Sequence, residues 1–141
     1  MAIQSKKVYI AQSAIFAFID RAHPKHTQAA AFFRYFANTG YQLFTDYVTI
    51  SETYQQLYQK IGPSLSRDFL RSLSFSTINI LSPEQNDMKA AVKVLTSYKD
   101  SELSFPEALM SVLADRRGIE YICSFDYIHP LFGLTLFDLP M

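Results

Sequence analysis

The sequence predicts an α/β protein, a three-layer α/β/α sandwich with a mainly parallel central sheet. Apolar segments short enough to be strands alternate with segments whose apolar residues repeat at the helical spacing. This alternation implies parallel strands that are joined by right-handed crossovers. The pattern continues without a repeat, a low-complexity tract or a linker, so we expect residues 1–141 to form a single domain.

The first part of the chain predicts two strands, each followed by a helix. A strand at 7–10 (KVYI) precedes a short buried helix at 13–19 (SAIFAFI), and a second helix is expected between Pro24 and Gly40. The segment 41–45 (YQLFT) is the second strand. The next helix carries its apolar side chains on one stripe and ends at Gly62-Pro63; the stripe contains Ile50, Tyr54, Leu57, Tyr58 and Ile61.

The second part of the chain repeats the alternation. A helix at 64–73 precedes a strand at 77–81 (TINIL). Ser82-Pro83-Glu84-Gln85 has the pattern of a capping box with proline in the first turn, which predicts a helix start. We expect the buried face of that helix to contain Met88, Val92 and Leu95.

The last expected helix begins at Ser104-Phe105-Pro106-Glu107, a second capping-box pattern. It is apolar almost all round, so we expect it to lie centrally in the fold. Strands at 121–125 and 134–137 complete the predicted sheet.

Composition excludes several classes of function. The chain is 49% hydrophobic with 13 basic and 13 acidic residues, which is typical of a globular protein and gives no broad basic surface for passive nucleic-acid binding. Cys123 is the only cysteine, so an intrachain disulfide is excluded, and we expect its thiol in the core. Neither a signal peptide nor a membrane-spanning segment is evident, so we expect a soluble, cytoplasmic protein.

Acidic residues recur at one predicted edge of the sheet. Asp46 and Asp126 follow strands, while Glu52 and Glu107 lie near helix starts, and both kinds of position lie at the carboxyl edge of a parallel sheet. Clustered carboxylates repel each other, and a hard divalent ion such as Mg²⁺ or Mn²⁺ relieves that repulsion. The chain has no Gly-rich phosphate loop, which argues against dinucleotide or P-loop binding. The carboxylates at this edge predict metal-assisted chemistry on a phosphate.

Each acid also has a purely structural interpretation. Glu107 completes a capping box and can reach back to a backbone amide. Glu52 lies opposite an apolar stripe, where solvated glutamates are common. Asp46 has the position of a helix N-cap, and Asp126 that of an Asx-turn.

Other polar residues are weaker candidates for a site. His23 and His26 have a spacing that permits metal ligation, but the HPKH segment is more typical of a loop that leads into a helix. His129 follows the last acid, in a segment typical of a turn. Arg116 and Arg117 lie at a helix end, where cations favour the helix dipole.

The chain resembles the PIN domains, specifically the VapC-type toxin ribonucleases of prokaryotic toxin–antitoxin pairs. The segments VYIAQSAIFAFID and FTDYVTISETYQQL resemble the family's first strand and helix and its second strand and helix. The most specific match is DSELSFPEALMSVLADRRGIEYICSFD. The resemblance implies a Mg²⁺- or Mn²⁺-dependent endoribonuclease that cleaves RNA with an acidic quartet, is often a homodimer and is held inactive by an antitoxin protein.

The resemblance also assigns residues to the site. Glu52 takes the second acidic place, Glu107 takes the third, where aspartate is usual, and Asp126 takes the fourth. Ser13 matches a small hydroxyl residue two positions after the first acid. Ala11 stands where the family has that first acid, and alanine cannot ligate a metal.

The substitution at position 11 implies that most activity is lost in this chain. It has two interpretations. Either the acid has been replaced deliberately, which protects the cell that produces a toxin, or the chain is a natural variant that Asp46 compensates or that only binds. The three remaining acids favour the first. A non-catalytic module that binds a protein or an RNA is the alternative function.

Overall fold

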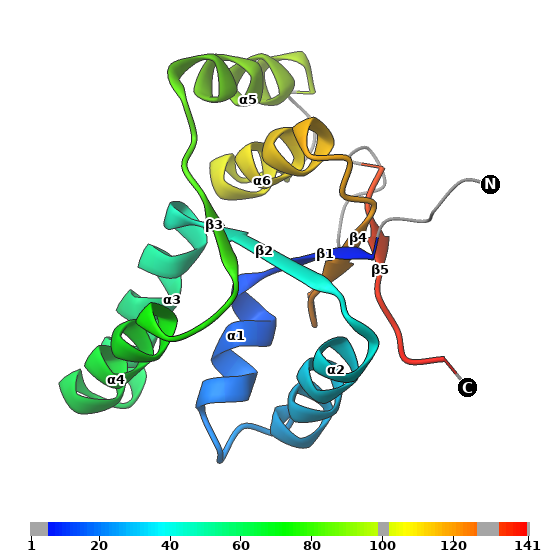
Figure 1. Cartoon of the computed structure of the whole chain (residues 1–141). Coiled ribbons are helices and arrows are strands. Elements are labelled where there is room, and N and C mark those ends of the chain that lie inside the picture. The colour runs from blue at the N-terminus through cyan, green and yellow to red at the C-terminus, as the bar shows by residue number, and fades with distance from the viewer. Residues whose placement is uncertain (1–5, 99–101, 127–132, 141) are drawn as a thin grey trace.

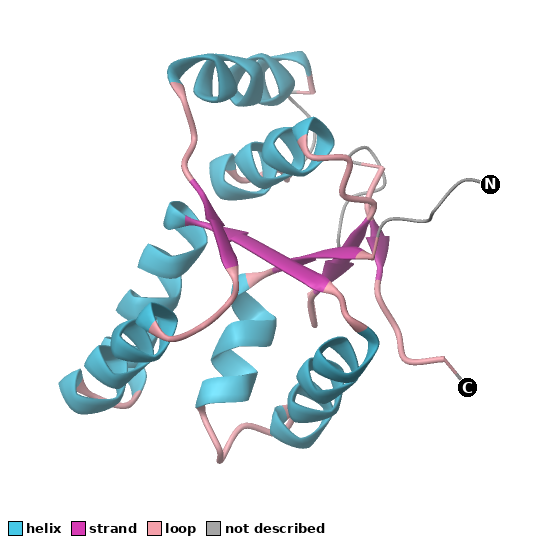
Figure 2. Cartoon of the chain, in the orientation of Figure 1, coloured by secondary structure: helices cyan, strands magenta, loops and turns pink. Residues whose placement is uncertain are grey.

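The computed structural model describes residues 6–98, 102–126 and 133–140, and these form the expected α/β sandwich. One sheet contains five parallel strands in the order β3-β2-β1-β4-β5. Helices α1–α4 lie on one side of the sheet and helices α5 and α6 on the other (Figures 1 and 2). His129 lies outside the described residues.

The elements follow the predicted order, and most bounds differ from the expected ones by one or two residues. The strands are β1 (Lys7–Ile10), β2 (Gln42–Asp46), β3 (Asn79–Leu81), β4 (Tyr121–Cys123) and β5 (Thr135–Leu136). The helices are α1 (Gln12–Ile19), α2 (His26–Thr39), α3 (Tyr47–Lys60), α4 (Pro63–Ser74), α5 (Gln85–Ser97) and α6 (Phe105–Arg116).

Two hydrophobic cores lie on the two faces of the sheet because side chains of a strand point alternately to opposite sides. Val8 and Ile10 of β1 pack into the core of α1–α4, while Tyr9 between them packs into the core of α5 and α6. Cys123 is buried in the first core as predicted, and burial raises the pKa of its thiol to about 12.

Helix α6 lies between the sheet and α5 (Figure 1). Its buried residues include Ala108, Leu109 and Leu113, which pack in the second core. Because one side of α6 contacts the sheet and another contacts α5, few of its positions face water. This placement explains why its sequence is apolar almost all round.

Helix α5 differs from the prediction in its start and in its buried face. Its N-cap is Glu84, which forms a reciprocal capping box with Asp87, so the helix begins later than the Ser82 pattern suggests. Met88 and Val92 are exposed, whereas Asp87 and Ala91 are buried. The small Ala91 faces the second core, and Asp87 lies 2.8 Å from Nε of Arg116 on α6. Met88 and Val92 therefore point outward, while Leu95 packs against the second core as predicted.

Helix α3 also buries a different face from the expected stripe. Ile50 and Leu57 are buried as predicted, but Tyr58 is 50% and Ile61 is 45% exposed. Thr53 is fully buried in their place, and its hydroxyl donates to the carbonyl oxygen of Thr49 at 2.7 Å. A threonine whose hydroxyl is satisfied within its own helix can occupy a core position, which an apolar stripe does not predict.

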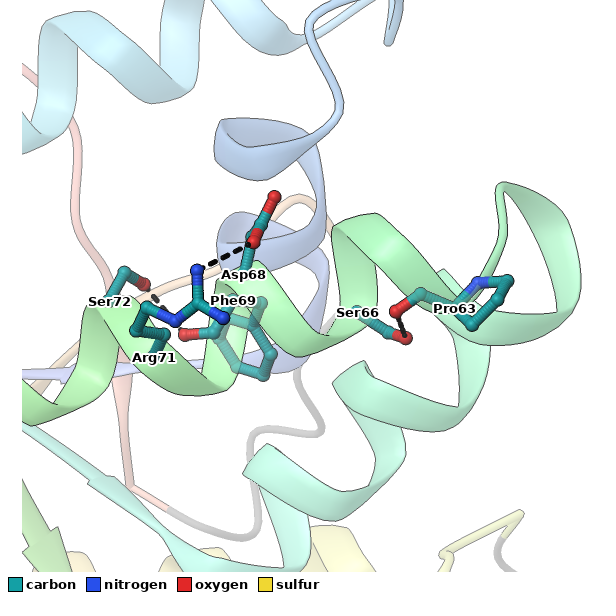
Figure 3. A network of polar contacts seen from close by, with 6 residues as sticks. All are labelled: Pro63, Ser66, Asp68, Phe69, Arg71 and Ser72. Atoms are coloured by element: carbon teal, nitrogen blue, oxygen red, sulfur yellow. Dashed lines mark hydrogen bonds and ion pairs between the residues drawn. The ribbon is translucent and has the colours of Figure 1, made fainter.

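Helix α4 packs beside α3 and buries Phe69 (Figure 3). Ser66 and Ser72 donate to the helix's own carbonyls at Pro63 and Phe69, at 2.9 Å and 2.7 Å, and Arg71 pairs with Asp68 at 3.5 Å on the exposed side. Among the helices of the described ranges, none is long and apolar enough to cross a membrane.

Candidate functional site

A small pocket lies at the carboxyl edge of the sheet. Its volume is about 170 Å³, and its walls come from the start of α1, the first turns of α3 and α6, and the segment after β4. The predicted site residues Ala11, Ser13, Glu52, Glu107 and Asp126 all line it. The structure therefore brings together the three acids and the hydroxyl that the sequence places there.

The topology of the sheet explains this convergence. In a parallel α/β sheet each helix runs back against the strands, so helix starts and strand ends meet at one edge. Strand β1 lies at the centre, beside β2 and β4, and the amide of Ala11 donates to the carbonyl oxygen of Cys123 at 3.0 Å. This bond holds the end of β1 against the end of β4, next to Ser124 and Asp126.

Glu107 is fixed by the start of its own helix. Ser104 is the N-cap of α6, and its hydroxyl accepts from the Glu107 amide at 3.2 Å. The same hydroxyl donates to Oε1 of Glu107 at 3.0 Å. The glutamate therefore reaches the cap hydroxyl and not the backbone amide that a capping box predicts, and it is held at the pocket wall.

Asp126 is positioned by a pair of serines. Ser13 Oγ lies 3.1 Å from Ser124 Oγ and accepts from the amide of Phe125 at 2.9 Å. Ser124 Oγ in turn accepts from the amide of Asp126 at 3.0 Å. The exposed carboxylate of Asp126 thus follows a turn that is tied to the start of α1.

The pKa of Glu52 depends on its burial and on the acids near it. Partial burial, followed by the charges of Asp46 and Glu107, raises the pKa of Glu52 above its ordinary value. Burial is the larger cause of this shift, and the smaller contribution of the two neighbouring acids agrees with the repulsion that the sequence predicts for this edge.

Asp46 does not line the pocket. Its carboxylate is buried and caps α3 by accepting from the amide of Thr49 at 2.8 Å. It also accepts from the hydroxyls of Thr49 and Tyr9. The N-cap interpretation of Asp46 is therefore confirmed, and its role as a compensating acid stays a prediction.

The carboxylates of this pocket do not by themselves form a metal site. Across residues 6–98, 102–126 and 133–140, no group of three or more His, Cys, Asp or Glu side chains is arranged to hold a metal ion. Ala11, which lines the same pocket directly after β1, contributes only a methyl group. Carboxylates are the right donors for Mg²⁺ or Mn²⁺, but position 11 supplies none.

Three other polar residues of the pocket wall were given no role by the sequence analysis, although Gln12 lies within the strand-end segment 11–13 that it expects at this edge. Ser124 lies directly after β4, where a short hydroxyl side chain can orient the following acid. Thr49 lies one turn before Glu52, on the same face of α3, and this spacing could have identified it. Gln12 bonds to Gln56 of α3, a contact between distant segments that no local pattern predicts.

The histidine pair 23/26 has structural partners. His23 Nδ1 accepts from the amide of Lys25 at 3.0 Å, and His26 Nδ1 lies 3.0 Å from the carbonyl oxygen of Ala17. Both rings thus support the turn that leads into α2, in agreement with the loop interpretation.

Comparison with known proteins identifies the fold. No protein-family model matches the sequence, and no curated protein matches it either. Among solved structures, VapC20 of Mycobacterium tuberculosis, a sarcin–ricin loop cleaving toxin, superposes with a TM-score of 0.81 at 17% identity, over 91% of this chain and 96% of that one.

Two further solved structures have the same fold as this chain. VapBC2 of Rickettsia felis, bound to a DNA fragment from their promoter, gives a TM-score of 0.71 at 10% identity and covers 92% of this chain and 96% of that one. PAE2754 of Pyrobaculum aerophilum gives a TM-score of 0.62 at 16% identity and covers 92% of this chain and 88% of that one. At these identities the likeness establishes the fold, and it extends over nearly the whole of each chain. The chain therefore has the PIN-domain fold of the VapC-type toxins.

Proposed function

We propose that this chain is a metal-dependent endoribonuclease of a toxin–antitoxin pair whose carboxylate set is incomplete at position 11. The observation that carries the proposal is the pocket, which Glu52, Glu107 and Asp126 from three distant segments line together with Ala11. As it stands, the chain cleaves RNA weakly or not at all.

Carboxylates gathered without a cationic partner favour a divalent ion. None of the three acids takes part in an ion pair within the described residues, and the pKa of Glu52 is raised by partial burial and, to a smaller extent, by the charges of Asp46 and Glu107. Mg²⁺ or Mn²⁺ supplies, when bound, the charge neutralisation that phosphodiester hydrolysis requires. Glu107 and Asp126 are the proposed ligands, Glu52 is the third acid, and Ser13 is a positioning residue.

The proposed partners follow from the same likeness. RNA is the proposed substrate, because one structural neighbour is a toxin that cleaves the sarcin–ricin loop. The R. felis neighbour was solved as VapBC2, and this supports a small antitoxin as the protein partner here. We also propose a homodimer that acts in the cytoplasm.

Replacing Ala11 by aspartate tests the proposal. In Ala11→Asp the missing carboxylate is restored at the end of β1, and we expect RNA cleavage that requires added Mg²⁺ or Mn²⁺. The rate should exceed that of the unmodified chain by about 100-fold or more, since losses even at outer positions of metal sites cost about 10–100-fold. Cleavage is measured on total RNA and on a ribosomal RNA fragment.

A neutral isostere is the matched control. Ala11→Asn has the same size as aspartate but no charge, and we expect it to remain inactive. Adding Asp126→Asn to Ala11→Asp should abolish cleavage and weaken Mn²⁺ binding in calorimetry. A folded Ala11→Asp protein that neither binds Mn²⁺ nor cuts RNA would contradict the nuclease proposal.

The second candidate is a non-catalytic interaction module. It is favoured by Ala11 and by the absence, among the described residues, of three side chains that hold a metal. This candidate predicts that the unmodified chain binds its protein or RNA partner as tightly as Ala11→Asp does and that the aspartate adds no cleavage.

A further inference from the structure

A second hollow opens directly beside the carboxylate pocket. Its volume is about 590 Å³, and it shares Gln12, Ser13 and Asp126 with the pocket. A polymer that passes the three acids would therefore extend into this hollow without a break. We call it the adjoining groove, and its wall includes His23, Lys25 and Lys60.

The three cationic or donor groups come from two different segments. His23 and Lys25 lie in the connection between α1 and α2, and Lys60 is the last residue of α3. Because His23 Nδ1 accepts from the Lys25 amide, the neutral ring carries its proton on Nε2, which is then a donor. The ammonium of Lys60 lies 5.4 Å from the centre of the Phe16 ring, which restricts it to this wall.

The start of α2 adds positive potential at the same wall. Lys25 is its N-cap, forms no side-chain cap, and is followed by a first turn without acidic residues. The first amides and the dipole of this helix therefore favour an anion. The groove also contains the carboxylates of Asp20 and Asp126. Asp20 Oδ1 accepts from the amide of Ala22 at 3.1 Å, which turns that oxygen toward the backbone.

The groove has an apolar side as well. Phe125 is partly buried and packs against Phe32, and Ile61 is 45% exposed. An aromatic ring beside cations is the combination on which bases of single-stranded RNA stack while their phosphates are paired. A small anion such as phosphate would need only the cations for binding and would make no use of the aromatic ring.

Charges are unevenly distributed over the molecule, although the net charge is zero. Apart from the buried Asp46, the segment 12–74 that forms α1–α4 carries more cations than acids. The cations are Arg21, Lys25, Arg34, Lys60, Arg67 and Arg71, and the acids are Asp20, Glu52 and Asp68.

We propose that the adjoining groove binds the single-stranded RNA backbone next to the phosphate that the carboxylate pocket would receive. Lys25 and Lys60 pair with phosphates, His23 donates a hydrogen bond, and Phe125 receives a base. The proposal rests on the proposed function for the direction of the strand, but RNA binding itself does not require cleavage. The unmodified chain, which lacks the first acid, is therefore a suitable protein for the test.

The test measures binding of a labelled single-stranded RNA by fluorescence anisotropy in EDTA, so that metal plays no part. Lys25→Gln and Lys60→Gln should each weaken binding by about fivefold at low salt, the upper range for an exposed ion pair. Each should also reduce the slope of log K against log salt by about 0.7, the value for one phosphate contact on a single strand.

Two controls separate charge from packing. Lys60→Arg keeps the charge over Phe16 and should keep the salt slope of the unmodified chain. Lys93→Gln removes an exposed cation from α5, on the other side of the sheet, and should leave affinity and slope unchanged. Circular dichroism confirms that each variant is folded.

The outcomes distinguish this inference from the proposed function. If Lys25→Gln and Lys60→Gln bind RNA with unchanged affinity and slope, the groove proposal is wrong, even where Ala11→Asp cleaves RNA. If both variants weaken binding while Ala11→Asp cuts nothing, the groove stands and the nuclease proposal falls. Binding of a poly-glutamate peptide that depends on both lysines, without binding of RNA, would assign the groove to an acidic protein and overturn the proposal.

Discussion

Ser13 Oγ lies 3.1 Å from Ser124 Oγ, and through this contact the start of α1 holds the segment that carries Asp126. The two serines are far apart in the sequence and meet only because β1 and β4 are neighbours in the sheet. Ser13 touches the acid's backbone support and not its carboxylate. Its role in the proposed site is therefore to position an acid.

Ser13→Ala tests this positioning role in the Ala11→Asp background. The substitution removes the acceptor of the Phe125 amide and frees Ser124, so Asp126 loses its fixed place. We expect kcat for RNA cleavage to fall by about tenfold, with KM little changed, as is typical when a supporting group of a metal site is lost.

Ser111→Ala is the matched control for that experiment. Ser111 lies on α6, and its hydroxyl donates only to the carbonyl oxygen of Ala108 within the same helix, at 2.7 Å. Its removal should leave kcat unchanged. An equal loss in Ser13→Ala and Ser111→Ala would show that the effect is general destabilisation.

The sequence predicts where the site lies better than it predicts the contacts between the side chains of the site. The edge at which Glu52, Glu107 and Asp126 meet follows from the alternation of strands and helices, since parallel topology alone fixes it. The Ser13–Ser124 contact could not be predicted, because it depends on which strands are neighbours. The Ser104–Glu107 pair was predicted as a local motif, but its geometry differs in the carboxylate's partner.

In the fold, too, the features that depend on local sequence could be predicted, and those that depend on distant contacts could not. The order of elements follows from periodicity, whereas the buried faces of α3 and α5 depend on what packs against them. Thr53 is buried because its hydroxyl is satisfied within α3, and Asp87 is buried because Arg116 reaches it from α6. Hydrophobic patterning cannot indicate polar residues whose partners are supplied by the fold.

Glu52→Gln tests the electrostatics of the pocket. The pKa of Glu52 is raised in the folded protein, so between its ordinary pKa and the raised value the folded state binds more protons than the unfolded state. The contribution of Glu52 to stability is therefore present below its ordinary pKa of 4.5 and is lost as pH rises through the raised value.

Glutamine removes that dependence. We expect Glu52→Gln to raise Tm by about 1–2 °C at neutral pH, a small effect because Glu52 is only partly buried and solvent screens its charge, and to change Tm little below pH 4.5. Calorimetry at several pH values without metal measures this difference. A Tm gain that is the same at all pH values would mean that the charge of Glu52 is not the cause.

Tyr9→Phe tests the hydrogen bond between Tyr9 and the buried carboxylate of Asp46. The Tyr9 hydroxyl donates to the buried carboxylate of Asp46, and burial together with that carboxylate raises the pKa of Tyr9. Phenylalanine fills the same space but leaves Oδ2 of Asp46 with only the Thr49 hydroxyl as donor. We expect a loss of about 1–3 kcal/mol in the free energy of unfolding, measured in urea.

The exposed Tyr121→Phe is its control, because that side chain is 40% exposed in β4. It should change stability by less than about 0.5 kcal/mol. Stability of Tyr9→Phe equal to that of the unmodified chain would show that the Tyr9–Asp46 hydrogen bond contributes nothing net.

Arg116→Met tests the ion pair that fixes the face of α5. Asp87 has a side chain only 3% exposed, and Arg116 Nε lies 2.8 Å from its Oδ1. Removing the guanidinium leaves a buried carboxylate whose Oδ2 still accepts from the Glu84 amide. Because Arg116 is itself 47% exposed, we expect a loss of about 1–3 kcal/mol, below the range for a fully buried pair.

Two variants separate the charge effect from lost packing in that experiment. Arg117→Met removes the exposed neighbouring cation at the C-cap of α6 and should change the free energy of unfolding by less than about 0.5 kcal/mol. Asp87→Asn, added to Arg116→Met, replaces the unpaired charge by a neutral amide that can still accept from Glu84 and should recover part of the loss. If the double variant is less stable than Arg116→Met alone, the arginine stabilises α5 through packing of its side chain and not through the ion pair.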